Sequence, residues 1–172
     1  MKKTRIIFPI ILLIFAFLAF NYSTSFIEES APPHISGFRL KNFSMNINEI
    51  DIQLKIGLLN PSDNYVRIED AELKLRIKGL TVATSELEDA ISIPPHGEKE
   101  ILTDFQISDP EMMNVIIDEL SRSSSLDINL TISGNYSPKI LEFSDLFQPK
   151  TFSSSFSAKV PVFTCPICAL KS

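Results

Sequence analysis

Two cysteines near the carboxyl terminus, Cys165-Pro-Ile-Cys168, form the sharpest chemical motif in the 172-residue sequence. Paired thiols at this spacing can close a disulfide, exchange thiols or supply two of the four ligands of a tetrahedral zinc. A redox site of the thioredoxin kind begins a helix after a strand, whereas this pair lies next to the chain end. We therefore interpret Cys165 and Cys168 first as a disulfide or inert thiols. A zinc shared with a second chain, and redox activity, remain open alternatives.

The histidines and acidic residues give weaker signals for a metal or catalytic site. His34 and His96 each follow a proline, so both are expected in surface turns. The acidic residues that could serve calcium are Glu86, Glu88 and Asp89, with Asp63, Glu69 and Asp70. They lack the twelve-residue spacing of a known calcium loop, so a solvated acidic edge is the better interpretation.

Sequence motifs of common enzyme classes are missing from the chain. It contains no H-E-x-x-H, no G-x-S-x-G, no Walker lysine loop and no G-x-G-x-x-G. We therefore expect a non-enzymatic protein without a cofactor. The formal net charge is −5, and removing the three positive charges of residues 1–27 leaves −8 on the remainder. An acidic domain is a poor partner for nucleic acid, because phosphate binding needs a basic surface.

The amino terminus has the pattern of a segment that engages a membrane. Three basic residues, Lys2, Lys3 and Arg5, precede an apolar run over residues 6–20. As a cleaved signal peptide, this run has a suitable length and a small residue, Ser25, for the cut. As an anchor, it reaches a membrane-spanning length only by extending to Ile27. We favour the anchor, because bulky Phe26 would follow the cut; either interpretation exports the remainder.

Alternating apolar and polar residues predict the strands of the domain that follows. Strict period-2 alternation places one face of a strand in the core and the other in water. The predicted core residues are Ile50, Ile52, Leu54, Ile56, Leu58, Leu73, Leu75, Ile128 and Leu130. The predicted strands cover residues 35–45, 47–59, 66–68, 71–77, 80–84, 91–94, 101–107, 126–132 and 152–162. The turn between the second and third contains Asn60-Pro61.

One amphipathic helix interrupts the strands. Ser108 and Glu111 have the spacing of a capping box, with Pro110 in the first turn. Met113, Ile116, Ile117 and Leu120 then follow at helical spacing and form one apolar stripe. The stripe is expected to pack in the core. As an alternative, Met113, Ile116 and Ile117 would line an apolar groove that takes up a ligand.

Together these elements predict an all-β protein. The expected fold is an immunoglobulin-like or fibronectin III-like antiparallel β-sandwich with one short helix, preceded by a transmembrane or signal segment. The predicted organisation is an anchor or signal peptide over residues 1–27, a linker over 28–34, the sandwich over 35–163 and a C-terminal tail over 164–172.

The order of these elements resembles the late-embryogenesis-abundant (LEA) group 2 family, also called the water-stress and hypersensitive-response (WHy) domain. The resemblance covers residues 35–163. It is carried by Asn60-Pro61-Ser62, the alternating run 71–82, the turn near Pro94, the helix from Pro110 and the closing strand to Pro161. Ser62 stands where the family usually has a second Asn. The pair of cysteines lies outside the family pattern.

The resemblance implies a fibronectin-like sandwich without enzymatic activity and with a stress-protective or membrane-surface role. Some relatives look like lipid-handling domains, with an apolar groove between the sheets. We therefore expect a membrane-tethered, extracytoplasmic domain that protects against stress such as desiccation by contacting lipid or protein surfaces. The alternatives are a lipid carrier, and an envelope assembly subunit that pairs through edge strands or through zinc at Cys165 and Cys168.

Overall fold

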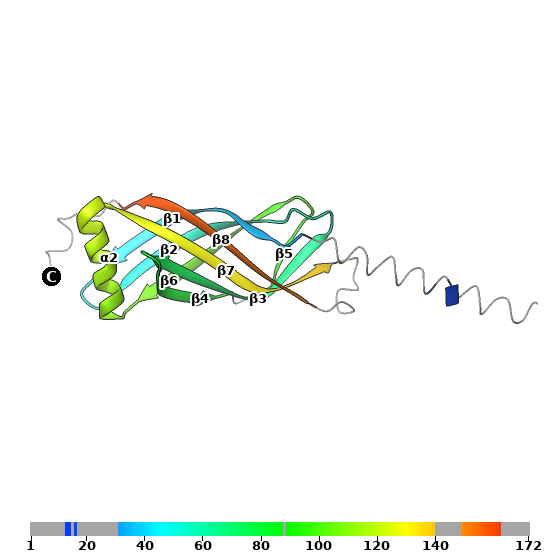
Figure 1. Cartoon of the computed structure of the whole chain (residues 1–172), viewed down its shortest axis with the longest axis horizontal. Coiled ribbons are helices and arrows are strands. Elements are labelled where there is room, and N and C mark those ends of the chain that lie inside the picture. Colours follow the sequence, from blue (N-terminus) through cyan, green and yellow to red (C-terminus); the bar gives the residue numbers. More distant parts are fainter. Residues whose placement is uncertain (1–12, 15, 17–30, 88, 140–148, 163–172) are drawn as a thin grey trace, which may run out of the picture. The chain divides into compact units, whose positions relative to one another are not determined.

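The computed structural model in Figure 1 describes residues 13, 14, 16, 31–87, 89–139 and 149–162. Almost all of the predicted anchor 1–27, Glu88 and both cysteines, Cys165 and Cys168, lie outside these residues. The chain divides into two units, residues 1–31 and 32–172. No helix among the described residues is long and apolar enough to cross a membrane.

The described part of the second unit consists of two antiparallel sheets and one helix. Strands β1 (His34–Met45), β2 (Ile50–Leu59) and β6 (Glu98–Ile107) form a three-stranded sheet in the order β1-β2-β6. Strands β4 (Leu80–Glu86), β3 (Tyr65–Ile77), β7 (Ser125–Lys139) and β8 (Lys150–Pro161) follow one another in the second sheet, and β5 (Ile91–Ile93) also pairs with β3. Helix α2 (Pro110–Ser123) stands across one end of the sheets (Figure 1).

The hydrophobic core lies between the two sheets, and the sequence predicted its composition. The nine predicted core residues are all buried, with at most 1% of their surface exposed: Ile50, Ile52, Leu54, Ile56, Leu58, Leu73, Leu75, Ile128 and Leu130. Helix α2 adds Met113 and Ile116 to the same cluster. The predictions of a mostly β, antiparallel, sandwich-like fold with one helix in this domain are therefore confirmed.

Strand β1 keeps its apolar side chains on the core although their spacing is irregular. Its pairing with β2 skips Ser36 and Lys41, which are extra residues opposite a continuous partner. Each extra residue is a β-bulge, and it turns the next apolar side chain back towards the core. Phe38, Leu40 and Phe43 consequently all pack against the core. The prediction that His34 lies in a turn is wrong, because His34 begins β1 and pairs with Leu59 of β2.

Strand β3 is continuous where the sequence predicted two strands, 66–68 and 71–77. A bulge lies between Glu69 and Glu72 in its pairing with β7, and Asp70 has a left-handed φ of 47°. The interruption in the alternation is therefore a local bulge and not a chain reversal. Gly134 of β7 lies against the bulge. A Cβ atom there would come within 2.7 Å of the Cα atom of Ala71, so the close approach requires glycine.

The predicted central strand 47–59 begins at Ile50, because the Asn46 side chain forms a turn before it. The Asn46 carboxamide oxygen accepts hydrogen bonds from the backbone N–H groups of Asn48 at 2.8 Å and Glu49 at 2.9 Å. An asparagine that binds the backbone two residues on stabilises a turn. Ile47 is left 94% exposed at the tip of this turn.

The N-cap of helix α2 lies one residue later than the capping box predicted, whereas the helix begins at Pro110, as the family resemblance implies. The N-cap is Asp109 and not Ser108, since the Asp109 carboxylate accepts hydrogen bonds from the N–H groups of Glu111 at 2.8 Å and Met112 at 3.4 Å. A carboxylate also interacts favourably with the positive end of the helix dipole. The predicted apolar stripe is confirmed for Met113 and Ile116, whereas Ile117 is 39% exposed.

An ion-pair cluster fastens α2 to the β3–β4 hairpin. The Lys78 Nζ atom lies 2.8 Å from a carboxylate oxygen of Glu119 and 3.3 Å from one of Asp118. The hydrogen bond that the Lys78 ammonium group donates to Glu119 contributes most to raising the pKa of Lys78 above its ordinary value. Lys78 and Gly79 both have positive φ angles, as a two-residue hairpin turn of type I′ requires. The turn therefore presents the lysine to the helix.

Truncating a central core side chain should destabilise the domain. Leu54→Ala removes a fully buried side chain and should lower the free energy of unfolding by about 2–5 kcal/mol through lost burial and the cavity left behind. Ile47→Ala, at an exposed position, is the matched control and should change it by less than about 0.5 kcal/mol. Urea unfolding of both variants measures the difference; equal effects would contradict the core assignment.

Filling the space beside the β3 bulge should also be destabilising. Gly134→Ala places a methyl group against the backbone of Ala71 and the Asp70 carbonyl and should cost about 1–3 kcal/mol through overpacking. Gly37→Ala is the control, because nothing lies within 4 Å of a Cβ atom at Gly37. Thermal denaturation compares the two variants. An unchanged melting temperature for Gly134→Ala would show that the bulge moves without cost.

Candidate functional site

The Asn60 side chain, which carries the family resemblance, is fully buried at the end of β2. Its Nδ2 atom donates hydrogen bonds to three backbone carbonyl oxygens, of Asn64 at 2.7 Å, Pro94 at 3.0 Å and Ile93 at 3.2 Å. Because an amide nitrogen carries two hydrogens, one hydrogen is shared between acceptors. Asn60 thus binds carbonyls of its own turn and carbonyls of a turn more than thirty residues away.

The Asn60 carboxamide oxygen organises the rest of the first turn. It accepts hydrogen bonds from Ser62, from the backbone N–H at 3.0 Å and from the Oγ hydroxyl at 2.7 Å. The Ser62 hydroxyl also lies 3.0 Å from the Asn64 carbonyl oxygen. Pro61, between the two residues, restricts its own φ and so preorganises the turn. The predicted turn at Asn60-Pro61 is confirmed by this geometry.

Backbone hydrogen bonds join the same two turns directly. The Asn60 N–H donates to the Gly97 carbonyl at 3.0 Å, and the His96 N–H donates to the Ser62 carbonyl at 3.2 Å. His96 lies in a turn, as predicted, with a left-handed φ of 50°, and its Nε2 atom is 2.7 Å from a carboxylate oxygen of Asp63 at the surface. We call this set of contacts between residues 60–64 and 93–97 the turn latch.

The turn latch leaves no polar atom of the Asn60 side chain for a ligand. Its donor and its acceptor are both engaged within the protein, and no buried side-chain polar atom among the described residues lacks a partner. Such complete satisfaction is what a buried amide requires in order to contribute to stability. The chemistry of the motif is therefore structural: it holds two chain segments in one arrangement.

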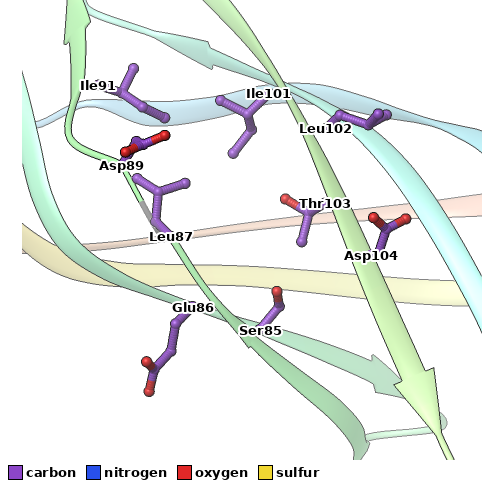
Figure 2. A pocket seen from close by; sticks show the side chains of 9 residues that line it. All are labelled: Ser85, Glu86, Leu87, Asp89, Ile91, Ile101, Leu102, Thr103 and Asp104. Carbon is purple, nitrogen blue, oxygen red and sulfur yellow. The ribbon is translucent and has the colours of Figure 1, made fainter.

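A groove opens on one side of the sandwich, where sequence reasoning had only predicted an acidic edge. It lies between β6 and the segment that joins β4 to β5 and has a volume of about 450 Å³ (Figure 2). Its lining residues are Ser85, Glu86, Leu87, Asp89, Ile91, Ile101, Leu102, Thr103 and Asp104. The groove depends on how two sheet edges diverge. Its only sequence signal is the uncharged run Ile101-Leu102-Thr103 within a strand otherwise rich in charge.

The other candidate acidic residues are dispersed. Asp63 contacts His96, Glu69 pairs with Arg67 at 2.9 Å, and Asp70 occupies the β3 bulge. The described residues contain no group of three or more His, Cys, Asp or Glu side chains arranged to hold a metal. Next to the groove, the Lys55 ammonium group hydrogen-bonds Glu100 and lowers the pKa of that carboxyl group.

The residues proposed to line a lipid groove lie elsewhere. Met113 and Ile116 are 8% and 0% exposed and pack in the core cluster, whereas Ile117 faces outward. None of the three lines the groove beside β6. Cys165 and Cys168 lie outside the described residues, so their disulfide or zinc chemistry remains a prediction.

Comparisons with known proteins assign no family to the chain. No protein-family model and no curated protein matches it. A protein from Archaeoglobus fulgidus is 7% identical with a TM-score of 0.46, over 76% of this chain and 98% of the other. A protein from Arabidopsis thaliana is 12% identical with a TM-score of 0.46, over 79% and 85%. A protein described as an LEA protein is 13% identical with a TM-score of 0.39, over 94% and 87%.

Replacing the latch amide with a carboxylate should weaken the domain in a pH-dependent way. Asn60→Asp turns an oxygen towards the carbonyls that Nδ2 now binds, and should lower the free energy of unfolding by at least about 3 kcal/mol at pH 7. Burial among carbonyls raises the pKa of the new carboxyl group in the folded state. The folded state then binds more protons than the unfolded state, so the variant should gain stability as pH falls from 7 to 4.

The control for this prediction is Asn64→Asp. Asn64 contributes its backbone carbonyl to the turn latch, so its substitution keeps the acceptor and should change stability by less than about 0.5 kcal/mol. Urea unfolding at pH 7, 5.5 and 4 separates the two variants. Equal stability of Asn60→Asp and the unsubstituted chain at pH 7 would contradict the structural role of the latch.

Proposed function

We propose that this protein is a non-enzymatic, LEA group 2-like domain that protects neighbouring proteins and membranes during water loss or similar stress. The observation that carries the proposal is the turn latch. The motif through which the sequence resembles the family is used entirely to hold the fold, which fits a protein whose working part is its surface. The strand orders β1-β2-β6 and β4-β3-β7-β8 support a fibronectin-like version of the sandwich.

The surface has properties suited to such a role. Residues beyond position 27 carry a formal charge of −8, which favours solubility and repulsion between copies. On the outer face of the larger sheet, polar side chains of β7 pair with serines of β8. Asn129 Nδ2 donates to Ser157 Oγ at 2.7 Å, and the hydroxyls of Thr131 and Ser155 lie 2.9 Å apart. A compact, hydrated surface of this kind would keep apolar or unfolding neighbours from aggregating.

The membrane location is part of the proposal and rests on the sequence. The basic residues Lys2, Lys3 and Arg5 before the apolar run 6–20 favour a tethered, extracytoplasmic domain. The packing of α2 supports protection over lipid carriage, because Met113 and Ile116 fill the core instead of lining the groove. In this mechanism the anchor concentrates the folded domain at the bilayer surface, where dehydration brings membranes and proteins together.

A drying experiment tests the protective role. We expect lactate dehydrogenase that is dried and rehydrated with the full-length chain, kept in neutral detergent, to retain more activity than with an equal mass of albumin in the same detergent. Leu54→Asp buries a charge in the core and should abolish folding; this variant should protect no better than albumin. Equal protection by the native chain and albumin, or by the native chain and Leu54→Asp, would contradict a role for the folded surface.

A further inference from the structure

The two sides of the sandwich, where edge strands of one sheet face edge strands of the other, differ in their contacts. On one side, the Ile35 N–H donates to the Ser154 hydroxyl at 3.0 Å, and the rings of Phe38 and Phe156 meet edge to face at 5.8 Å. These contacts join β1 to β8. On the other side, β6 is the edge strand of the three-stranded sheet and pairs only with β2 among the described strands. The groove lies along this free edge.

The free edge of β6 has an apolar inner side and an acidic outer side. Figure 2 shows Leu87, Ile91 and Ile101 directed towards one another, while Leu102 and Asp104, which also line the groove, extend to the opposite side of β6. Leu102 is 59% exposed. By the alternation of a strand, Glu100 lies on the same outer face as Leu102 and Asp104. Edge strands in monomeric proteins usually carry charges or a covering segment, and the centre of β6 has an uncharged run and an open groove.

The charges at this edge discriminate between possible occupants. If a second copy paired antiparallel through β6 about Leu102, Glu100 of each copy, which pairs with Lys55 of its own chain, would lie opposite Asp104 of the other copy. Acidic groups directly opposed are destabilising. The remaining rim residues, Glu86 and Asp89, are also acidic and exposed. An extended peptide with apolar side chains on one face and basic side chains on the other would match both sides of the edge.

We propose that β6 binds an extended segment of a partner protein as a fourth strand of the three-stranded sheet. The partner backbone hydrogen-bonds the free edge of β6, and its apolar side chains enter the groove against Leu87, Ile91 and Ile101. Its lysines or arginines lie beside Asp104, since Glu100 already pairs with Lys55. Strand addition obtains affinity from main-chain hydrogen bonds and specificity from alternate side chains. The partner is therefore a protein with an exposed, basic and apolar β segment.

The test measures binding of short fluorescent peptides to the full-length chain in neutral detergent by anisotropy. A peptide of alternating valine and lysine should bind at least about tenfold more tightly than one of alternating valine and glutamate, since the edge is acidic. Hydrogen exchange should slow at backbone amides within residues 100–105 when the first peptide is bound. Absence of saturable binding, or slowed exchange only elsewhere, would overturn the proposal.

Two charge-reversal variants distinguish binding at the β6 edge from nonspecific electrostatic attraction of a basic peptide to an acidic protein. Asp104→Lys should weaken binding of the valine–lysine peptide about tenfold, because it opposes the basic side chains at close range. Asp127→Lys, an equal charge change on the other sheet at the exposed start of β7, should change it by less than about twofold at physiological ionic strength. Equal weakening by both variants, or a dimer formed through β6 without peptide, would overturn the proposal.

Discussion

The buried carboxamide of Asn60 is the contact on which the arrangement of the two sheets depends. The chain passes from the smaller sheet to the larger between β2 and β3, and returns between β5 and β6. Both passages occur at the same end of the sandwich, and the Asn60 side chain binds carbonyls of each. The Asn60 side chain therefore fixes the distance and alignment between the β2–β3 and β5–β6 connections. Inside a protein, a fully satisfied polar group of this kind specifies one arrangement, whereas a partly satisfied one is costly.

The opposite end of the sandwich is closed by different chemistry. There the chain passes between the sheets through α2, which adds Met113 and Ile116 to the core and pairs Asp118 and Glu119 with Lys78. These ion pairs are partly exposed, so salt and solvent screen them. The end of the sandwich that α2 closes should consequently unfold before the end that holds the turn latch. The side of the sandwich between β4 and β6 stays open along the groove. This opening leaves β6 as a free edge strand beside the packed core.

The local alternation of apolar and polar residues was enough to predict the core and most strands. It was insufficient wherever the backbone departs from the regular two-residue period of a strand. Five alternating residues of β2 determined its buried face. By contrast, the bulges at Ser36, Lys41 and Asp70 add single residues whose effect depends on the partner strand. The N-cap moved from Ser108 to Asp109 because two neighbouring residues both suit that position. The latch brings together residues more than thirty positions apart, and the groove forms between residues 85–91 and 101–104, so no local pattern could locate their partners.

Native-state hydrogen exchange of the latch amides tests the central claim most directly. The backbone N–H groups of Asn60 and His96 donate hydrogen bonds between the two turns of the latch, and those of Ser62 and Gly97 donate within the turns. If the latch holds the two passages together, these amides exchange only through global unfolding, with the same free energy as the amide of Leu54 in the core. Exchange at the rate of an ordinary surface turn would show that the latch opens independently, and would contradict its role in holding the fold.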